Sequence, residues 1–253
     1  GKDVKIPSKL RGKKVTQIDT NAFENSDITS VEIGNNVTYI GKSAFDGCKF
    51  LKTVKLGKSI LNIDENCFGN CTSLEEITLP KSVEKLGGSI FANCTSLKKV
   101  ELEDGGNFAI KNDVLFSSDM KKLYFALPYA KLGNYTCPDS VETIMPLAFF
   151  RCKDLTEFTF SDKVKVVPQG IFVLCSNLKK IEFPESVNQI SSVITLQSGI
   201  KEITIPSSVK TIDNNAFIKS DGSVDTDLVI RTTSGSKAAD YAKDKGIKVE
   251  LIK

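Results

Sequence analysis

The chain has 253 residues, with 34 Lys and Arg against 31 Asp and Glu, so that its formal net charge is +3. This near-balance gives no argument for a nucleic-acid partner or for an anionic membrane surface. The sequence contains no His, which excludes Ser-His-Asp triads, Cys-His pairs and imidazole metal ligands. It also contains no apolar run of about 18 residues, so we expect no membrane insertion of this segment.

A pair formed by a small or aliphatic residue and Phe recurs along the chain. The Phe residues of these pairs are Phe23, Phe45, Phe68, Phe91, Phe149, Phe172 and Phe217. They lie 22 or 23 residues apart, except for a gap of 58 residues after Phe91 and one of 45 residues after Phe172. The second gap spans about two repeats, with Val193-Ile194 as a degenerate pair near its midpoint. The sequence therefore has an internal repeat of 22–23 residues.

Each repeat also carries a strand signal. Downstream of Phe runs Leu-x-x-aliphatic-x-aliphatic, as in Leu74, Ile77 and Leu79, and the last two positions alternate as in a strand with one buried face. Pro often follows, as at Pro80, and ends the strand because it has no N–H to donate. One repeat is too short to bury its apolar positions, whereas stacked repeats cover one another. The pattern predicts a leucine-rich-repeat solenoid.

The unit Cys-x-x-Leu-x-x-Ile-x-Leu-Pro-x-x-Val-x-x-Ile-x-x-x-Ala-Phe closely resembles the BspA-like class of leucine-rich repeats, over roughly residues 4–235. The resemblance implies a curved, right-handed stack of coils of 22–23 residues with a parallel β-sheet face. It implies little helix except a short C-terminal capping helix. We expect residues 1–253 to form a single leucine-rich-repeat domain.

Two segments depart from the repeat. The 58-residue gap holds Val114-Leu115-Phe116 and Leu123-Tyr124-Phe125 around a polar turn, which predicts a hairpin within enlarged coils at about 103–137. At the end of the chain, residues 234–242 resemble the closing helix of such proteins, and Gly246 stands where its C-cap would lie. We therefore expect a C-terminal cap at about 234–253, ending in a strand around Val249.

The seven Cys residues do not form a metal or disulfide pattern. Five of them share one repeat position, three residues after the repeat Phe: Cys48, Cys71, Cys94, Cys152 and Cys175. Ser or Gln fills the same position in other repeats, which is typical of a small packing site. The total is odd and no Cys-x-x-Cys is present, so we interpret these thiols as structural. The acidic cluster of Asp221, Asp225 and Asp227 lacks the EF-hand order and is interpreted as a solvated loop. We expect no catalytic residue, no metal and no cofactor.

Outward residues of the predicted strands make the best candidate for a ligand-binding face. They flank the central aliphatic residue of each strand and are charged or Thr: Glu76, Thr78, Lys99, Glu101, Glu157, Thr159, Lys180 and Glu182. Tyr124 and Tyr129, near the hairpin, are the candidate aromatic anchors. The alternative is a polar sheet face that only keeps the protein in solution.

The resemblance implies a non-catalytic, protein- or glycan-binding repeat module rather than an enzyme. It places the protein at a bacterial cell surface or among secreted, adhesion-type proteins, with a host or matrix protein or glycan as partner. We expect a monomer and no nucleic-acid partner. The alternative is an intracellular scaffold for protein–protein interactions, which free Cys residues favour because the cytosol keeps thiols reduced.

Overall fold

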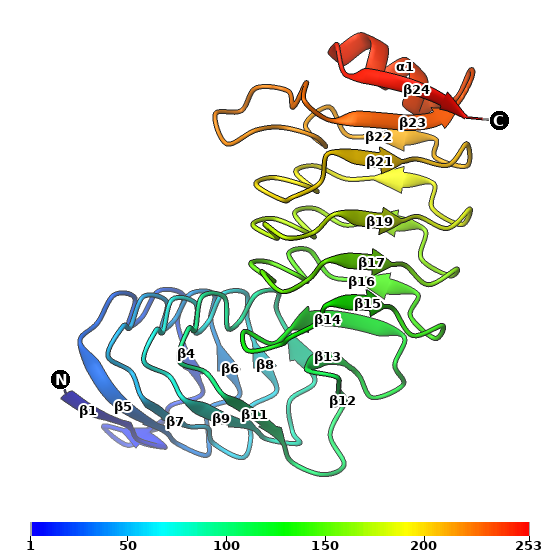
Figure 1. The fold of residues 1–253 in the computed structure, drawn as a ribbon. Coiled ribbons are helices and arrows are strands. Elements are labelled where there is room, and N and C mark those ends of the chain that lie inside the picture. The colour runs from blue at the N-terminus through cyan, green and yellow to red at the C-terminus, as the bar shows by residue number, and fades with distance from the viewer. Residues whose placement is uncertain (1, 253) are drawn as a thin grey trace. The chain divides into compact units, whose positions relative to one another are not determined.

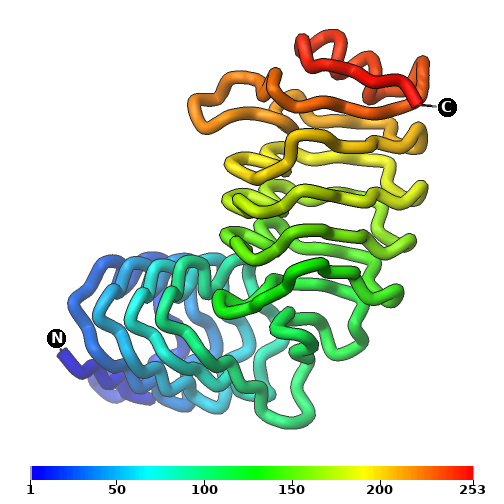
Figure 2. The backbone as a smooth tube through the Cα atoms, viewed as in Figure 1, coloured from blue at the N-terminus to red at the C-terminus, as the bar shows by residue number. Residues whose placement is uncertain are grey.

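The computed structural model describes residues 2–252, which fall into two compact units. Unit 1 runs from the N-terminus to Lys111 and includes Leu127–Tyr129. Unit 2 comprises Asn112–Ala126 and the chain from Ala130 to the C-terminus. In each unit the chain winds through successive stacked coils (Figures 1 and 2). Each unit is described on its own below, and the single domain expected from the sequence remains a prediction.

Unit 1 contains two parallel sheets, because every coil contributes one strand to each. The major sheet has the order β1 (Lys2–Ile6), β5 (Ile28–Ile33), β7 (Thr53–Lys55), β9 (Glu76–Leu79) and β11 (Lys99–Leu102). The minor sheet consists of β4 (Gln17–Ile18), β6 (Tyr39–Ile40), β8 (Asn62–Ile63) and β10 (Lys85–Leu86). A small hairpin of β2 (Lys9–Leu10) and β3 (Lys13–Lys14) follows β1, and β12 (Phe108–Lys111) ends the first part of the unit.

Unit 2 repeats this arrangement. Its major strands are β15 (Asn134–Thr136), β17 (Glu157–Thr159), β19 (Lys180–Glu182), β21 (Glu202–Thr204), β23 (Val229–Thr233) and β24 (Lys248–Ile252). Its minor sheet is formed by β18 (Val166–Val167), β20 (Gln189–Ile190) and β22 (Thr211–Ile212). The predicted hairpin is present as β13 (Val114–Ser117) and β14 (Lys122–Ala126), which pair antiparallel. The described residues contain one helix, α1 (Lys237–Lys245).

The predicted solenoid of leucine-rich repeats is confirmed: the chain forms about 11 turns of about 23 residues. Repeat Phe residues occupy equivalent positions in successive coils, and all of them except Phe23 are buried. In unit 1 their rings stack, with centroids 5.1 Å apart for Phe23 and Phe45 and 5.4 Å apart for Phe45 and Phe68. In unit 2 the strand position holds Phe158 instead of an aliphatic residue, and its ring meets Phe149 edge to face at 4.8 Å. The apolar repeat positions therefore form a continuous core within each unit.

The capping helix is also confirmed. Ser236 is its N-cap, with a side-chain oxygen that accepts a hydrogen bond from the Ala239 N–H, and Gly246 ends it with φ 69°. Ala238 and Ala242 are fully buried. The Tyr241 ring lies 5.9 Å from that of Phe217, edge to face. The helix thus covers apolar groups of the last coil, which would otherwise face water.

Candidate ligand-binding faces

The outward residues predicted from the repeat lie side by side on the two major sheets. In unit 1, Lys99 of β11 is in register with Glu76 of β9, and Glu101 is in register with Thr78. In unit 2, strands β17 and β19 pair Glu157 with Lys180 and Thr159 with Glu182. Between these residues, the central aliphatic or aromatic side chains point inward and are buried. Both units therefore present the same four side-chain types in the same order, here called tetrad 1 (Glu76, Thr78, Lys99, Glu101) and tetrad 2 (Glu157, Thr159, Lys180, Glu182).

The contacts within the two tetrads are also the same. Lys99 Nζ lies 2.5 Å from a carboxylate oxygen of Glu101, and Lys180 Nζ lies 2.5 Å from one of Glu182. Thr78 donates to Glu101 at 3.3 Å, and Thr159 donates to Glu182 at 3.1 Å. The hydrogen bond to the lysine lowers the pKa of each of these carboxyl groups and raises the pKa of each lysine. The lysines and these glutamates remain largely exposed, so the tetrads are preformed polar surfaces.

A shallow hollow of about 320 Å³ lies elsewhere on the major sheet of unit 1. It is lined by residues of β1, β5 and β7, among them Asp3, Lys5 and Glu32. Asp3 accepts hydrogen bonds from Thr29 and Ser30, which lower the pKa of its carboxyl group. Our sequence analysis did not assign residues of β1 to the face. The signal was present, because Val4 and Ile6 alternate ahead of a proline as in the later strands.

The two candidate aromatic anchors lie in different surroundings. Tyr124 retains only 8 % exposure, and Lys122 Nζ lies 4.9 Å from its ring centroid. Its strand, β14, pairs with the minor strand β16 (Thr143–Ile144), not with the major sheet. Tyr124 is therefore nearly buried and lies away from the major sheet, and its role as an anchor stays a prediction. Tyr129 is half-buried, and its hydroxyl oxygen accepts the N–H of Val100 in β11 at 3.3 Å, so that it lies beside tetrad 1.

All seven cysteines are buried and carry free thiols, as the structural interpretation requires. In the shared repeat position, each of four thiols donates to the carbonyl of a repeat Phe in the preceding coil. The bonds run from Cys48 to Phe23, Cys71 to Phe45, Cys94 to Phe68 and Cys175 to Phe149, at 3.0–3.2 Å. Burial raises the pKa of Cys94 and of Cys175 to about 12, so both stay protonated at neutral pH. These thiols link coils and lack the thiolate character of a reactive site.

Two further features of the molecule concern metal binding and membrane spanning. Within residues 2–252 no group of His, Cys, Asp and Glu is arranged to hold a metal ion. The carboxylates of the acidic loop form ion pairs with a lysine of the same loop: Lys219 Nζ lies 2.8 Å from Asp227 and 3.9 Å from Asp225. In the described part of the chain, no helix combines the length and apolar character that crossing a bilayer requires.

Comparison with known proteins gives a repeat family and a set of similar folds. The pattern of the BspA type leucine rich repeat region matches residues 16–136 and 124–222, as six copies. No curated protein matches the chain significantly. The crystal structure of the pneumococcal vaccine antigen PcpA aligns with a TM-score of 0.74 and 22 % identity, covering 99 % of this chain and 79 % of that protein.

Two further solved structures are similar. A leucine-rich cell surface protein from Faecalibacterium prausnitzii aligns with a TM-score of 0.54 and 20 % identity, covering 99 % of this chain and 91 % of that one. A leucine-rich repeat protein from Eubacterium ventriosum gives a TM-score of 0.55 and 20 % identity, over 92 % of this chain and 60 % of that one. At these identities the likeness shows the fold.

Proposed function

This chain belongs to the BspA-type leucine-rich repeat family, and on that premise we propose that it is a non-catalytic binding module of a bacterial cell surface. It recognises a host or matrix protein or glycan through the outward rows of its major sheets, and it does so as a monomer. Repeat stacks suit this task because they present extended surfaces whose side chains vary without disturbing the core. The structural likeness to a cell surface protein and to a vaccine antigen supports this placement.

The observation that carries the proposal is the repetition of the tetrad. Packing fixes the inward residues of β9, β11, β17 and β19, but it places no demand on largely exposed side chains such as Lys99 and Lys180. Among the other major strands, β5 carries Ser30 and Glu32 instead, whereas β21 repeats only the outward Glu and Thr, as Glu202 and Thr204. A surface repeated with its internal contacts in both units is what two equivalent subsites for one kind of partner would require.

The chemistry of the tetrads indicates how such a partner is held. The lysine of each tetrad is already paired with a glutamate, so its charge is partly neutralised within the face. Contacts to exposed charges contribute only about 0.2–1 kcal/mol each. Affinity therefore comes from many hydrogen bonds over a long surface, from two subsites acting together, and from an aromatic anchor. For unit 1 the anchor we propose is Tyr129, which is half-buried beside β11.

A binding assay with charge-reversed variants tests the proposal. The purified chain is applied to immobilised host matrix proteins and to a glycan array, and then compared with Glu76→Lys, Glu157→Lys and the double variant. Each substitution places a second cation beside the tetrad lysine, so we expect each single change to weaken binding and the double change to abolish it. The matched control is Glu84→Lys with Glu185→Lys, which makes the same charge change at exposed positions off the major sheets.

Two results of this assay would count against the proposal. If no matrix protein and no glycan binds, the surface-binding role is wrong. If a partner binds and the control weakens it as much as the tetrad variants do, the effect is one of net charge and the assigned faces are wrong.

The free cysteines, which favoured an intracellular scaffold, do not decide between the two placements. Burial raises the pKa of Cys67 and of Cys152 well above the ordinary value, so their thiols would resist oxidation outside the cell as well as inside it. Protease treatment of intact producing cells gives the decision. We expect rapid loss of the chain from intact cells, whereas protection until the cells are lysed would support the scaffold.

A further inference from the structure

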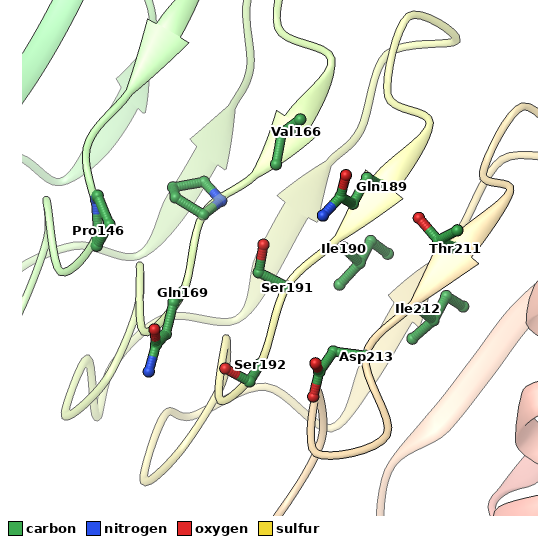
Figure 3. Close-up of a pocket in the computed structure, with 11 residues that line it drawn as sticks. Pro146, Val166, Gln169, Gln189, Ile190, Ser191, Ser192, Thr211, Ile212 and Asp213 are labelled. Carbon is green, nitrogen blue, oxygen red and sulfur yellow. The ribbon is translucent and has the colours of Figure 1, made fainter.

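The minor sheet of unit 2 carries a second hollow, separate from the tetrads, with a volume of about 450 Å³ (Figure 3). Val166, Gln189 and Thr211 stand in register on the neighbouring strands β18, β20 and β22 and line one part of it. The turns that follow these strands contribute the other part, including Ser191 and Asp213. The volume lies within the range of small-molecule sites, about 300–1,000 Å³.

The hollow results from differences in side-chain size between successive coils. Pro168, Ser191 and Asp213 occupy the same position of three coils, directly after the last residue of each minor strand. Ser191, in the middle coil, has the smallest side chain of the three. Pro168 and Asp213 in the neighbouring coils therefore extend beyond Ser191 and form the walls of the hollow. The outward strand residues close it along one side.

Five of its six polar side chains have no hydrogen-bond partner in the described part of the chain, and the sixth, Asp213, accepts the Asn215 N–H at 2.9 Å. Gln169, Gln189, Ser191, Ser192 and Thr211 line the hollow, and in the described part of the chain their side chains make no hydrogen bond or ion pair. These amides and hydroxyls can each donate and accept. The hollow thus combines a concave shape with a set of hydrogen-bonding groups that the fold itself does not use.

The minor sheet of unit 1 shows the opposite condition. There the corresponding polar groups bond to one another: Gln17 donates to Asp19 at 2.8 Å, and the Tyr39 hydroxyl donates to Asp64 at 2.8 Å. Lys42 similarly lies 2.9 Å from Glu65. In unit 1 most of these polar groups are thus satisfied within the sheet, with Asn62 as an exception whose side chain makes no hydrogen bond in the described part of the chain.

We propose that this hollow binds a short, neutral oligosaccharide. Amide and hydroxyl groups that donate and accept at once match the adjacent hydroxyls of a sugar ring. Pro146, Pro168 and the 41 % exposed Val166 provide apolar surface for the C–H face of the ring. Asp213 is the only charged residue of the lining and disfavours anionic sugars.

The backbone of the sheet argues against the main competitor, an extended peptide added as a strand. Strands β18, β20 and β22 already pair with one another, and the turn N–H groups of Ser191 and Asp213 donate to Val167 and Ile190 in the coils before them. The middle strand β20 is paired on both sides, so at the centre of the hollow a ligand meets side chains and finds no free main-chain ladder.

The test measures binding of a panel of short neutral hexose and N-acetylhexosamine oligomers, with sialylated and sulfated counterparts, by calorimetry. The full chain is compared with Gln169→Ala/Gln189→Ala, which removes both amides, and with Ser191→Leu, which fills the floor of the hollow. Asn62→Ala is the matched control, because Asn62 holds the position of Gln189 in unit 1. Thermal unfolding and circular dichroism confirm that every variant is folded.

We expect at least one neutral oligomer to bind, with affinity at least about tenfold weaker in the double amide variant and in Ser191→Leu. The control should stay within about twofold of the unchanged chain, and the anionic counterparts should bind less tightly. The proposal is overturned if no neutral oligomer binds, if only anionic sugars bind, or if the hollow variants bind as well as the control. The Glu76→Lys/Glu157→Lys variant should keep this binding, so the result is independent of the tetrads.

Discussion

Val193 has a left-handed backbone conformation, with φ 58°, which is rare for a residue with a branched β-carbon. In the coils of unit 1 the same position, two residues before the repeat Phe, is taken by Asn21 and Asn66, which tolerate it well, and by the unbranched Ser43 and Ser89. Leu147 and Leu174 likewise hold positive φ values in unit 2. The turns of unit 2 are therefore more strained than those of unit 1.

Relieving this strain should stabilise the protein. We expect Val193→Asn and Val193→Gly each to raise the free energy of unfolding by about 0.5–1 kcal/mol, measured by urea denaturation. Val193→Ala is the control, because alanine keeps the β-carbon that causes the strain. An Asn variant no more stable than the Ala variant would show that the backbone strain at Val193 has no measurable cost.

Because of the buried thiols, we expect the free energy of unfolding to fall as the pH rises into the alkaline range. The folded-state pKa of Cys94, Cys137 and Cys175 is raised to about 12 by burial, whereas an unfolded thiol titrates near about 8.5. Their contribution is thus fully present below about pH 8 and is lost as pH rises through about 12. Below about pH 8 the thiol is protonated in both the folded and the unfolded state. Above about pH 8 the thiol of the unfolded chain loses its proton first, which favours unfolding.

A single substitution isolates this effect from other groups that titrate at high pH. Cys94→Ser should be mild at neutral pH, with a cost of about 1 kcal/mol, because Ser26 occupies the equivalent position and a hydroxyl can donate to Phe68 as the thiol does. Between pH 8 and pH 11 the urea midpoint should fall less steeply for this variant than for the unchanged chain. Equal slopes would refute the assignment of a raised pKa to Cys94.

At the scale of the element, the stacked Phe residues are among the largest fully buried side chains of the protein. Phe68 is fully buried and stacks between Phe45 and Phe91. Phe68→Ala should lower the free energy of unfolding by about 3–5 kcal/mol. Phe23→Ala, in the first repeat where the ring is only half-buried, should cost clearly less. Equal losses in the two variants, measured by chemical denaturation, would contradict a core built from coil-to-coil stacking.

The major strands and the capping helix could be predicted from the sequence, whereas the second, minor strand of each coil was not predicted. The spacing of the Phe residues sets the coils, and alternation around residues such as Ile77 and Val100 separates inward from outward side chains. The five Cys of the shared position could be assigned to the core because Ser occurs there too. Each of these inferences uses information that lies within one repeat or recurs in several.

The environment of the hairpin was not predicted correctly from the repeat. Leu123, Tyr124 and Phe125 are three consecutive buried residues, so β14 is covered on both faces and does not alternate. An unbroken apolar run was the available signal that Tyr124 is nearly buried. That β14 pairs with the minor strand β16 could not be predicted, since the insertion interrupts the repeat. The hollow around Ser191 was equally out of reach, because it depends on the relative sizes of side chains in three coils.

At the scale of the whole molecule, the outward residues of the major sheets contribute little to the stability of the fold. Coils contact only their neighbours through inward residues, so exposed tetrad residues can change with little effect on folding. The chain also carries two tetrads, and two weak subsites that engage a repetitive partner together gain affinity through their effective concentration. The account therefore predicts a large effect on binding from substitutions that barely alter stability.

One measurement tests this central claim most directly. In a single variant, Glu76, Lys99, Glu157 and Lys180 are all replaced by Ser, and both thermal unfolding and binding to the matrix proteins or glycans retained by the unchanged chain are measured. The control replaces Lys58, Glu84, Lys163 and Glu185, which are exposed residues outside the tetrads with the same balance of charge. We predict that both variants keep their unfolding temperature within about 3 °C and that only the tetrad variant loses binding, by about a hundredfold or more. A folded tetrad variant that binds as tightly as the control would contradict the account.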